Sequence, residues 1–542
     1  MTEPVFQSRV QVNSQEFQRN RADMNVLVAK VDELRARAAA LSEKSKGRFE
    51  KRGQLLPRQR LSRLLDPGSP FLELHNMAGF LVDDEDPDTS VPGASTINGI
   101  GFIAGVRCMI VVNDSGINAG AMTTTTSEKT TRAQDIALQQ KLPFVNLVES
   151  AGADLLKYEV EMWMAAGGSF ARLARLSAAG IPTITILHGL SVAGGAYMPG
   201  MSDYVIGVKN NGMAALAGPA LLKSATGEEA DNATLGGSEM HSKVSGLVEY
   251  LAEDDAHAIS ICRDLVSKLD WNRHCQKPLP TDYQEPVYHS DELIGTVPVD
   301  YRQAYDAREV VARLVDQSNM LDFKPGFGIS MVCLQAKIMG MPVGVLCNNG
   351  PIDPAGANKA AQFIQLCDQA DIPLVFLQNI TGYMVGTEYE QAGMVKHGSK
   401  MIQAVTNARV PKITMMIGAS FGAGNYGMCG KGYDPDFVFS WPNIQIGVMG
   451  GEQAAKTMSE VFRAGAKRKG ISVDEEQIAQ QEAAVIHHYN KQSDAFYTSG
   501  RLLDDGIIDP RDTRRVLGMT LQTCWEARSR KLFPNTFGVG RM

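Results

Sequence analysis

The chain has 542 residues, of which 44% are hydrophobic and 21% are charged, a composition typical of a globular protein with more than one core. Its 53 basic and 60 acidic residues leave a net charge of −7, which argues against nucleic acid as a partner. No apolar run is long enough to span a bilayer, and the mixed sequence excludes collagen-like, coiled-coil and disordered classes. We expect a soluble chain of roughly two to four domains.

The eight cysteines and the first residues of the chain indicate a cellular compartment. The cysteines lie far apart, with no CxxC pair and no histidine at ligand spacing, which argues against a zinc site and a disulfide framework. The first residues lack the basic and apolar regions of a signal peptide. These features predict reduced thiols, a cytoplasmic location and no metal in this chain.

The first hundred residues contain two predicted helices and the first predicted strands. Residues 14–46 place apolar side chains at helical spacing among charged ones, which predicts an exposed amphipathic helix used for packing or subunit contact. A second predicted helix, residues 61–65, ends at an Asp-Pro-Gly turn at 66–68. Residues 97–112 contain short β-branched runs broken by glycine, the pattern of strands.

Most of the remaining chain alternates short apolar runs with helical stretches, which predicts an α/β fold. Continuous apolar runs are typical of strands that are buried on both faces of a sheet. Glycine-rich turns follow most of these runs, at the carboxyl ends of strands, where open α/β sheets bind their ligands. The predicted buried strands are 144–148, 183–187, 343–347, 374–377 and 413–417.

An internal repeat is the clearest feature of the organisation. Residues 181–197 (IPTITILHGLSVAGGAY) align with residues 410–426 (VPKITMMIGASFGAGNY) with 7 identities in 17 positions. Residue usage of roughly 5–7% predicts about one identity by chance. The repeat predicts a duplicated α/β domain with two matched sites. Two shorter matches pair 142–145 with 372–375 and 112–116 with 346–350.

A proline-rich polar stretch, residues 276–300, separates the two copies and predicts a linker. We place the boundary between the copies near residues 285–300. The predicted domains are therefore residues 1–290 and residues 291–542.

Motifs for nucleophilic or metal catalysis are missing, since the sequence holds no GxSxG, HExxH or GxxxxGK[ST] pattern. For His241 and His397 a solvated or structural hydrogen-bonding role is favoured over a catalytic one. Ser150 and Thr381 follow predicted buried strands, but neither motif contains a histidine or lysine base, so we do not expect nucleophiles there.

Two glycine-rich turns carry the chemical signal instead. Ala-Gly-Gly-Ala-Tyr at 193–197 and Gly-Ala-Gly-Asn-Tyr at 422–426 each end a predicted strand and begin a helix. Small residues let a ligand approach the backbone, whose N–H groups point outward at a helix start. Such donors form an oxyanion hole, each worth ~3–4 kcal/mol to an enolate. Tight packing of a helix against a strand is the alternative reason for glycine in these turns. The loops at 149–153 and 379–386 are expected to line the two sites.

These motifs resemble the carboxyltransferase (β) subunit of biotin-dependent acyl-CoA carboxylases from about Arg52 to the C-terminus. Residues 376–382 (FLQNITG) and 537–539 (FGV) resemble most the 3-methylcrotonyl-CoA and geranyl-CoA branch. The other motifs that carry the resemblance are LLDPGSPF at 64–71, AGGAY at 193–197, TGEE at 226–229, LGG at 235–237, FGAGNYGMCG at 421–430 and VMGGEQAA at 448–455.

The resemblance implies two tandem crotonase-like ββα-spiral domains, with acyl-CoA on the N-terminal domain of one subunit and biotin on the C-terminal domain of a neighbour. In such enzymes carboxybiotin releases CO2, the biotin enolate removes a substrate proton, and the resulting carbanion captures CO2, so the cofactor supplies the base. The implied partner is a biotinylated ATP-dependent α subunit that carries the biotin carboxylase and the biotin carrier. The implied assembly is α6β6, which contains a homo-hexamer of this chain, without a membrane partner.

The same resemblance assigns individual residues. Gly194 and Gly195 match the site of the thioester oxygen, and Ala423 and Gly424 match the site of the biotin oxygen. The other residues expected to bind the acyl-CoA are Ser150, Ala151, Gly152, Ala153, Ala166, Gly167, Ala171 and Tyr197. The other residues expected to bind biotin are Thr381, Gly382, Tyr383, Phe421 and Tyr426.

One departure from the family concerns the acyl group. Methylcrotonyl-CoA relatives carry bulky aromatic residues where this chain has small residues at 165–171 (AAGGSFA). A larger pocket accepts a longer acyl tail, since each extra buried CH2 contributes ~0.8 kcal/mol. The departure therefore favours geranyl-CoA, carboxylated at its γ carbon, over methylcrotonyl-CoA. A remodelled subunit surface with no effect on acyl length is the alternative.

Other functions remain open on the residues alone. A biotin-dependent acyl-CoA decarboxylase subunit would use the same site residues in the reverse direction. A stand-alone crotonase-type hydratase would need a paired glutamate acid and base in one site. A non-catalytic scaffold would leave the two glycine turns without a purpose.

Overall fold

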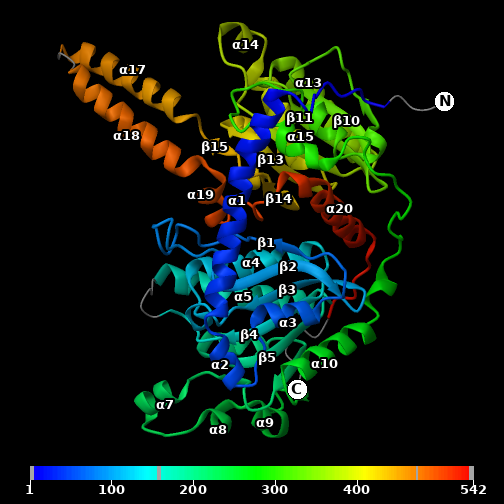
Figure 1. Ribbon diagram of the computed structural model, residues 1–542, viewed down its shortest axis with the longest axis vertical. Helices are drawn as coiled ribbons and strands as arrows, with labels where there is room; N and C mark the ends of the chain where they lie inside the picture. The colour runs from blue at the N-terminus through cyan, green and yellow to red at the C-terminus, as the bar shows by residue number, and fades with distance from the viewer. Residues whose placement is uncertain (1–4, 155–159, 471–473, 536–542) are drawn as a thin grey trace. The chain divides into compact units, whose positions relative to one another are not determined.

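The computed structural model describes residues 5–154, 160–470 and 474–535 (Figure 1). It divides into an N unit built on Glu33–Leu279 and a C unit built on Pro280–Ser499. The division lies close to the predicted boundary after residue 290, within the predicted linker. The terminal segments do not follow this order along the chain. The described residues up to Asp32 belong to the C unit, and those from Thr523 belong to the N unit.

The N unit contains an eight-stranded sheet in the order β1-β2-β3-β4-β5-β6-β8, with β7 paired to the end of β5. β2 and β3 form an antiparallel hairpin, and β3, β4, β5 and β6 run parallel. β4 is buried along its whole length, and β3 and β5 are buried except near their carboxyl ends, as their apolar composition predicts. The strands are β1 (Leu72–Leu74), β2 (Thr96–Ile103), β3 (Val106–Asn113), β4 (Phe144–Ser150), β5 (Thr183–Val192), β6 (Tyr204–Val208), β7 (Met213–Ala215) and β8 (Tyr250–Ala252).

The C unit repeats this arrangement in a seven-stranded sheet, with the order β14-β13-β12-β11-β10-β9 and with β15 paired to the end of β13. β10 and β11 form the antiparallel hairpin, and β11 to β14 run parallel. The strands are β9 (Met320–Asp322), β10 (Met331–Ile338), β11 (Met341–Asn348), β12 (Leu374–Ile380), β13 (Lys412–Phe421), β14 (Phe437–Ser440) and β15 (Gln445–Gly447).

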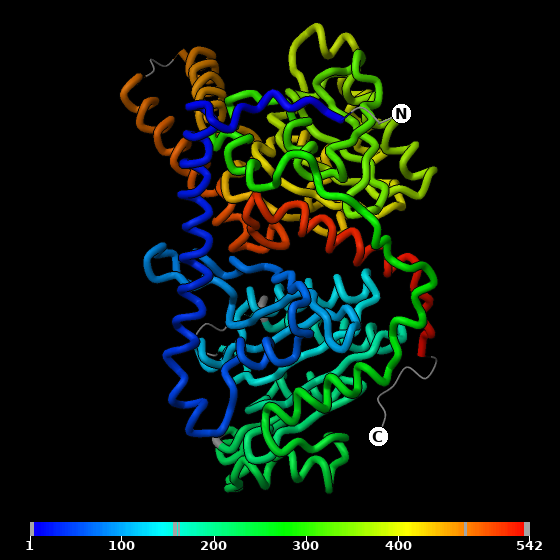
Figure 2. Tube along the Cα trace, turned by 45° about the vertical axis from the view of Figure 1, so that its right-hand side comes forward, coloured from blue at the N-terminus to red at the C-terminus, as the bar shows by residue number. Residues whose placement is uncertain are grey.

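Helices connect the strands in both units. The predicted N-terminal amphipathic helix is confirmed as α1 (Gln15–Glu43), which buries the apolar side chains expected on one face, Met24, Val28, Val31 and Leu34. α17 (Gly451–Lys469) and α18 (Glu475–Ser493) pack against each other in the C unit, shown in orange in Figure 2. The helices that begin in the N unit are α2 (Lys46–Lys51), α3 (Pro57–Leu64), α4 (Thr124–Gln139), α5 (Val160–Ala178), α6 (Tyr197–Gly200), α7 (Pro219–Thr226), α8 (Asn232–Gly236), α9 (Ser238–Met240) and α10 (Asp255–Lys268). Those that begin in the C unit also include α11 (Leu293–Thr296), α12 (Ala307–Ala312), α13 (Pro354–Gln369), α14 (Thr387–Gln391), α15 (Met394–Asn407), α16 (Ala423–Gly427), α19 (Ala495–Gly500) and α20 (Thr513–Ser529).

The strand pairings confirm the predicted duplication and correct one detail of it. In both sheets one equivalent pair of strands, β4 with β5 and β12 with β13, shifts register near the carboxyl end of the first strand. The hairpins pair Thr96 with Asn113 and Met331 with Asn348, so Asn113 is the equivalent of Asn348. The sequence match had placed Asn113 opposite Cys347 and is wrong by one residue. The segments that follow β3 and β11 differ in length, so the short match had no anchor on its C-terminal side.

The aspartate of the Asp-Pro-Gly motif has a structural role that Asp316 repeats in the C unit. The Asp66 carboxylate accepts hydrogen bonds from the backbone N–H groups of Ala104 (2.8 Å) and Gly105 (2.7 Å) in the β2–β3 turn, and it pairs with Arg263 (2.8 Å). The motif thus fixes the hairpin to α3 and α10. The C unit repeats these contacts with Asp316, Met339, Gly340 and Arg514.

A buried carboxyl group in the C unit makes stability depend on pH. Burial, with the neighbouring Asp505 adding to it, raises the pKa of Asp504 to about 6. An unfolded aspartate titrates near about 3.9, so the protonated group stabilises the fold fully below that pH, and this stability is lost as the pH rises through 6. Relative to Asp504→Asn, the wild type should lose about 3 kcal/mol of unfolding free energy between about pH 4 and pH 7. Urea unfolding at both values measures this difference, and equal pH dependence in the two proteins would contradict it.

None of the helices in the described ranges is both long enough and apolar enough to cross a bilayer.

Candidate functional site

The two glycine-rich turns occupy equivalent places, at the carboxyl ends of β5 and β13. The first forms a single 3-10 turn over Ala193–Ala196, and the second forms α16. Each begins with a residue of positive φ at the matching position, Ala193 at 52° and Gly422 at 55°. The predicted pair of matched turns is therefore present in the fold. The roles of their residues in binding stay predictions.

The side chains and backbone of the two turns are exposed in the same pattern. Gly195 and Gly424 are buried, whereas the preceding residues, Gly194 and Ala423, are exposed. Ala423 and Gly424 are the first two residues of α16, whose backbone N–H groups have no acceptor within the helix. Backbone donors at such positions are suited to an anionic oxygen.

A chain of buried hydrogen bonds holds the C-unit turn. Asn425 Nδ2 donates to Ser420 Oγ (2.8 Å), and Ser420 Oγ donates to Gln378 Oε1 (2.7 Å). Gln378 Nε2 then donates to the carbonyl oxygen of Met428 (2.8 Å). The turn is thus tied to both β12 and β13, which fixes its amides before a ligand arrives.

The C-unit turn also requires glycine at position 424. A Cβ atom there would lie 2.5 Å from Ile380 Cγ1 and 3.2 Å from the Cα of Gly382. The predicted biotin residue Tyr383 lies under the turn, because a Cβ on Gly427 would come within 2.3 Å of its hydroxyl. Burial raises the pKa of the Tyr383 phenol, so this residue packs as a neutral group.

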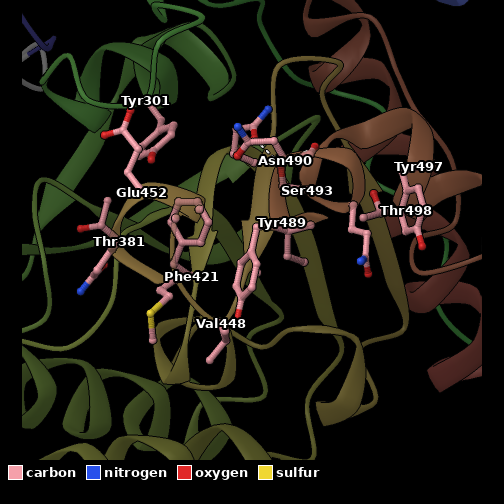
Figure 3. Close-up of a pocket in the computed structure, with 18 of the residues that line it drawn as sticks. Tyr301, Thr381, Phe421, Val448, Glu452, Tyr489, Asn490, Ser493, Tyr497 and Thr498 are labelled. Atoms are coloured by element: carbon pink, nitrogen blue, oxygen red, sulfur yellow. Dashed lines mark hydrogen bonds between the residues drawn. The ribbon is translucent and has the colours of Figure 1, made fainter. Parts of the chain in front are cut away.

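A cavity of about 720 Å³ in the C unit opens beside this turn. Figure 3 shows Phe421 and Tyr489 near its middle, with Thr381 and Glu452 beside Phe421. Of the five other residues predicted to bind biotin, the cavity is lined by Thr381 and Phe421, while Gly382, Tyr383 and Tyr426 are not among its lining residues. The Tyr301 ring meets the Phe421 ring edge to face at 5.3 Å.

Sequence reasoning missed the part of this cavity that comes from helices. Glu452 lies on α17 and Tyr489 on α18, and Tyr301 precedes α12. The motif at 448–455 supported the family resemblance and was the signal for Glu452, although no site role was inferred from it. Tyr489 and Tyr301 carry no motif, so only the fold brings them to the cavity.

The N-unit turn is flanked by α5. A Cβ atom on Gly194 would lie 3.5 Å from Phe170 Cζ, and the ring of Phe170 meets the ring of Tyr197 at 5.6 Å. Ala166 precedes Phe170 by one helical turn and so shares its face of α5. Gly167 and Ala171 are exposed, on a different side of the helix.

A second cavity of about 520 Å³ lies in the N unit next to Tyr197. Its lining is mainly apolar and includes Leu216, Leu235 and Leu247. Tyr197 therefore both lines this apolar cavity and contacts Phe170 of α5.

The loop predicted to begin at Glu149 begins later, because β4 continues through Ser150. The Ser150 hydroxyl donates to the carbonyl oxygen of Gly120 (2.6 Å) and accepts from the N–H of Gly152 (3.1 Å). Ser150 is thus buried and held by two hydrogen bonds, and its predicted role in binding acyl-CoA stays a prediction. Ala151 and Ala153 are exposed, and Gly152, with φ at 87°, places its Cα near the carbonyl oxygen of Val192. In the C unit β12 likewise continues, to Ile380, so Thr381 is the first loop residue.

The two histidines singled out from the sequence lie within hydrogen-bond distance of neighbouring groups, and their roles stay a prediction. His241 Nε2 lies 2.7 Å from the carbonyl oxygen of Ala214, and its Nδ1 lies 2.6 Å from Ser245 Oγ. His397 Nδ1 lies 2.9 Å from Asn358 Oδ1. Within the described residues, no three His, Cys, Asp or Glu side chains gather as they would around a metal ion.

Comparison with known proteins identifies the family. The carboxyl transferase domain matches residues 48–539. The chain is 47% identical to the probable biotin-dependent acyl-coenzyme A carboxylase beta2 subunit of Mycobacterium tuberculosis, over 99% of this chain and 100% of that protein. It is 45% identical to the biotin-dependent 3-methylcrotonyl-coenzyme A carboxylase beta1 subunit of the same organism, over 95% of this chain and 97% of that protein.

A solved structure agrees with these relatives. The crystal structure of the Pseudomonas aeruginosa geranyl-CoA carboxylase beta subunit matches with a TM-score of 0.92 and 47% identity, over 99% of this chain and 100% of that one. The duplicated fold, the matched turns and these similarities agree with one another. The chain therefore belongs to the carboxyl transferase domain family and is the carboxyltransferase component of a biotin-dependent acyl-CoA carboxylase.

Proposed function

We propose that this carboxyltransferase moves CO2 from carboxybiotin to the γ carbon of geranyl-CoA. The observation that carries the proposal is the small side chain of Ala166 on the face of α5 that contacts the Gly194 turn through Phe170. A small residue there leaves room for a long acyl tail beside the thioester site. The 47% identity to a geranyl-CoA carboxylase beta subunit supports the same substrate.

The two turns divide the binding work. The amides of Gly194 and Gly195 would hold the thioester oxygen, where negative charge develops when the substrate loses its γ proton. The amides of Ala423 and Gly424 would hold the oxygen of the biotin ureido ring, and the tethered geometry of that turn fits a small planar acceptor. Biotin, when bound, supplies the carboxyl group and the base. The chain itself binds, orients and excludes water around both groups.

The remaining assignments follow from the family. The other acyl-CoA residues named from the sequence would line the N-unit site, and Thr381 and Phe421 would border biotin in the C-unit cavity. We infer that biotin arrives on a biotinylated ATP-dependent α subunit and that the chain forms a hexamer within an α6β6 complex. Its cytoplasmic location stays a prediction.

The substrate is tested with an acyl-CoA panel on the complex of this chain with its biotinylated partner. ATP- and bicarbonate-dependent carboxylation should be faster on geranyl-CoA than on methylcrotonyl-CoA. Ala166→Phe should lower kcat/KM for geranyl-CoA by about tenfold and spare methylcrotonyl-CoA, because the ring fills the space of roughly two or three methylene groups. The control is Ala178→Phe, at the far end of α5, which should change neither rate.

Methylcrotonyl-CoA is the second candidate, favoured by the 45% identity to a 3-methylcrotonyl-CoA carboxylase subunit. Faster carboxylation of methylcrotonyl-CoA by the wild type would select it. Equal effects of Ala166→Phe on both substrates would remove the role of Ala166 in acyl length.

A further inference from the structure

The N unit contains a buried group of charged side chains that links four of its elements. Arg60 on α3 donates to the Glu149 carboxylate of β4 (2.7 Å) and to the Asp255 carboxylate of α10 (2.8 Å). His188 on β5 lies with its Nδ1 2.7 Å from the other Asp255 oxygen. All four side chains are at most 6% exposed, so the fold removes at least one cation and two anions from water.

The C unit shows that the fold does not need these charges. The Arg60 position is one helical turn before Leu64, whose carbonyl oxygen accepts from Arg263, and the matching Leu314 carbonyl accepts from Arg514. The matching residues of the C unit, read from these contacts and from the strand pairings, are Val310 for Arg60, Ile417 for His188 and Asn379 for Glu149.

The two units also hold their turns differently. The C-unit tether through Gln378, Ser420 and Asn425 has Val148, Ser191 and Ala196 at its matching positions in the N unit. In agreement, the buried Ser191 hydroxyl finds no hydrogen-bond partner among the described residues. The N-unit turn therefore lacks the side-chain tether that fixes the other turn.

Glu149 is placed to supply the missing restraint. It stands in the irregular part of β4, between Val148 and Ser150, where the pairing with β5 shifts register. Its side chain lies over Gly189 of β5, where a Cβ atom would come within 2.5 Å of Glu149 Cγ. Two residues after Ser150, Gly152 lies against Val192, the residue before the Gly194 turn. Fixing Glu149 thus fixes the loop that borders the turn.

We propose that Arg60 and Glu149 are positioning residues for the acyl-CoA half of the reaction. Their ion pair holds the end of β4, and with it the loop of Ala151, Gly152 and Ala153, against the turn that contains Gly194 and Gly195. A charged hydrogen bond is shorter and stronger than a neutral one, which suits a restraint on geometry. The inference rests on the proposed assignment of the N unit to acyl-CoA.

The test compares two rates of the same complex with the biotinylated partner. One is carboxylation of saturating acyl-CoA. The other is breakdown of carboxybiotin without acyl-CoA, in which the N–CO2 bond breaks, CO2 leaves and the ring nitrogen takes a proton from water; bicarbonate-dependent ATP hydrolysis reports it. Both rates are proportional to the amount of active complex, so their ratio is independent of the fraction of active protein. Only the first rate uses the acyl-CoA site, so a fall in the ratio reports a defect in that site.

Glu149→Gln should lower this ratio by about tenfold, since small displacements of reacting groups have large effects on rate. The double variant Arg60→Val with Glu149→Asn copies the C-unit residues and should lower it equally. The control is Glu526→Gln, which breaks another N-unit ion pair, that of the buried Arg107 on β3 with the half-buried Glu526 on α20 (3.0 Å). It should leave the ratio within about twofold of wild type.

An unchanged ratio in either Glu149 variant would overturn the inference. So would failure of both to assemble while Glu526→Gln assembles, because the ion pair would then be a requirement of the fold. If the wild-type complex carboxylates no acyl-CoA at all, the proposed function fails instead.

Discussion

Gly424→Ala should lower the rate of carboxyl transfer by at least about 100-fold, the usual effect of losing one oxyanion donor. The added Cβ atom would lie 2.5 Å from Ile380 Cγ1, inside a turn that hydrogen bonds hold in place. The turn must shift to relieve this contact, and the shift moves the amide away from the biotin oxygen. Carboxylation of acyl-CoA and carboxybiotin breakdown without acyl-CoA should both fall, while the affinity for acyl-CoA, measured by calorimetry, stays the same.

The matched control for this variant is Ala423→Gly. It removes an exposed methyl group at the adjacent position, keeps the N–H, and gives the residue found at the matching Gly194. We expect its rate within a few-fold of wild type. If Gly424→Ala is as active as Ala423→Gly, the C-unit turn is not the biotin oxygen site.

Asp255→Asn should lower the free energy of unfolding by about 3–5 kcal/mol, the cost of breaking a buried ion pair from one side. Its carboxylate accepts three hydrogen bonds, from the Leu55 N–H (2.8 Å), Arg60 Nε (2.8 Å) and His188 Nδ1 (2.7 Å). Burial alone would raise its pKa, but these partners outweigh burial and lower the pKa of Asp255 to about 2. The group is therefore charged at neutral pH, and the amide leaves Arg60 short of a counter-charge. Urea unfolding at pH 7 measures the loss.

The neighbouring Asp254 provides the comparison. It caps α10 by accepting from the His257 N–H (2.8 Å), and it is exposed. Asparagine caps helices as well as aspartate, so Asp254→Asn should change the unfolding free energy by less than about 0.5 kcal/mol. Equal losses in the two variants would show that the buried network contributes little.

The parts of the fold that could be predicted from the sequence are those written in short segments. The two turns could be found because a duplicated strand and turn leave the same glycine spacing twice, at 193–197 and 422–426. Buried parallel strands could be found because burial on both faces demands an unbroken apolar run. The residue-by-residue alignment of β3 with its equivalent β11 could not be predicted, because it depends on the lengths of the loops on either side.

The parts that could not be predicted depend on contacts between distant residues. Arg60 meets Asp255 across 195 residues, and neither position lies in a motif that signals charge pairing. Tyr301, which precedes α12, Tyr489 on α18 and Phe421 at the end of β13 all line one cavity. Such groupings follow from packing of the whole unit, and a pattern read along the chain does not contain them. Ala166 was only partly predictable. Its small size is evident from the sequence, but the face of α5 on which it lies is known only from the structure.

The central claim is that two copies of one turn hold two different oxygens. A structure of the complex with a stable acyl-CoA analogue and biotin bound together tests it most directly. We expect the thioester oxygen within about 2.7–3.2 Å of the amides of Gly194 and Gly195, and the ureido oxygen within the same distance of the amides of Ala423 and Gly424. A thioester oxygen or a ureido oxygen that contacts neither turn, or that lies at the turn assigned to the other, would contradict the account.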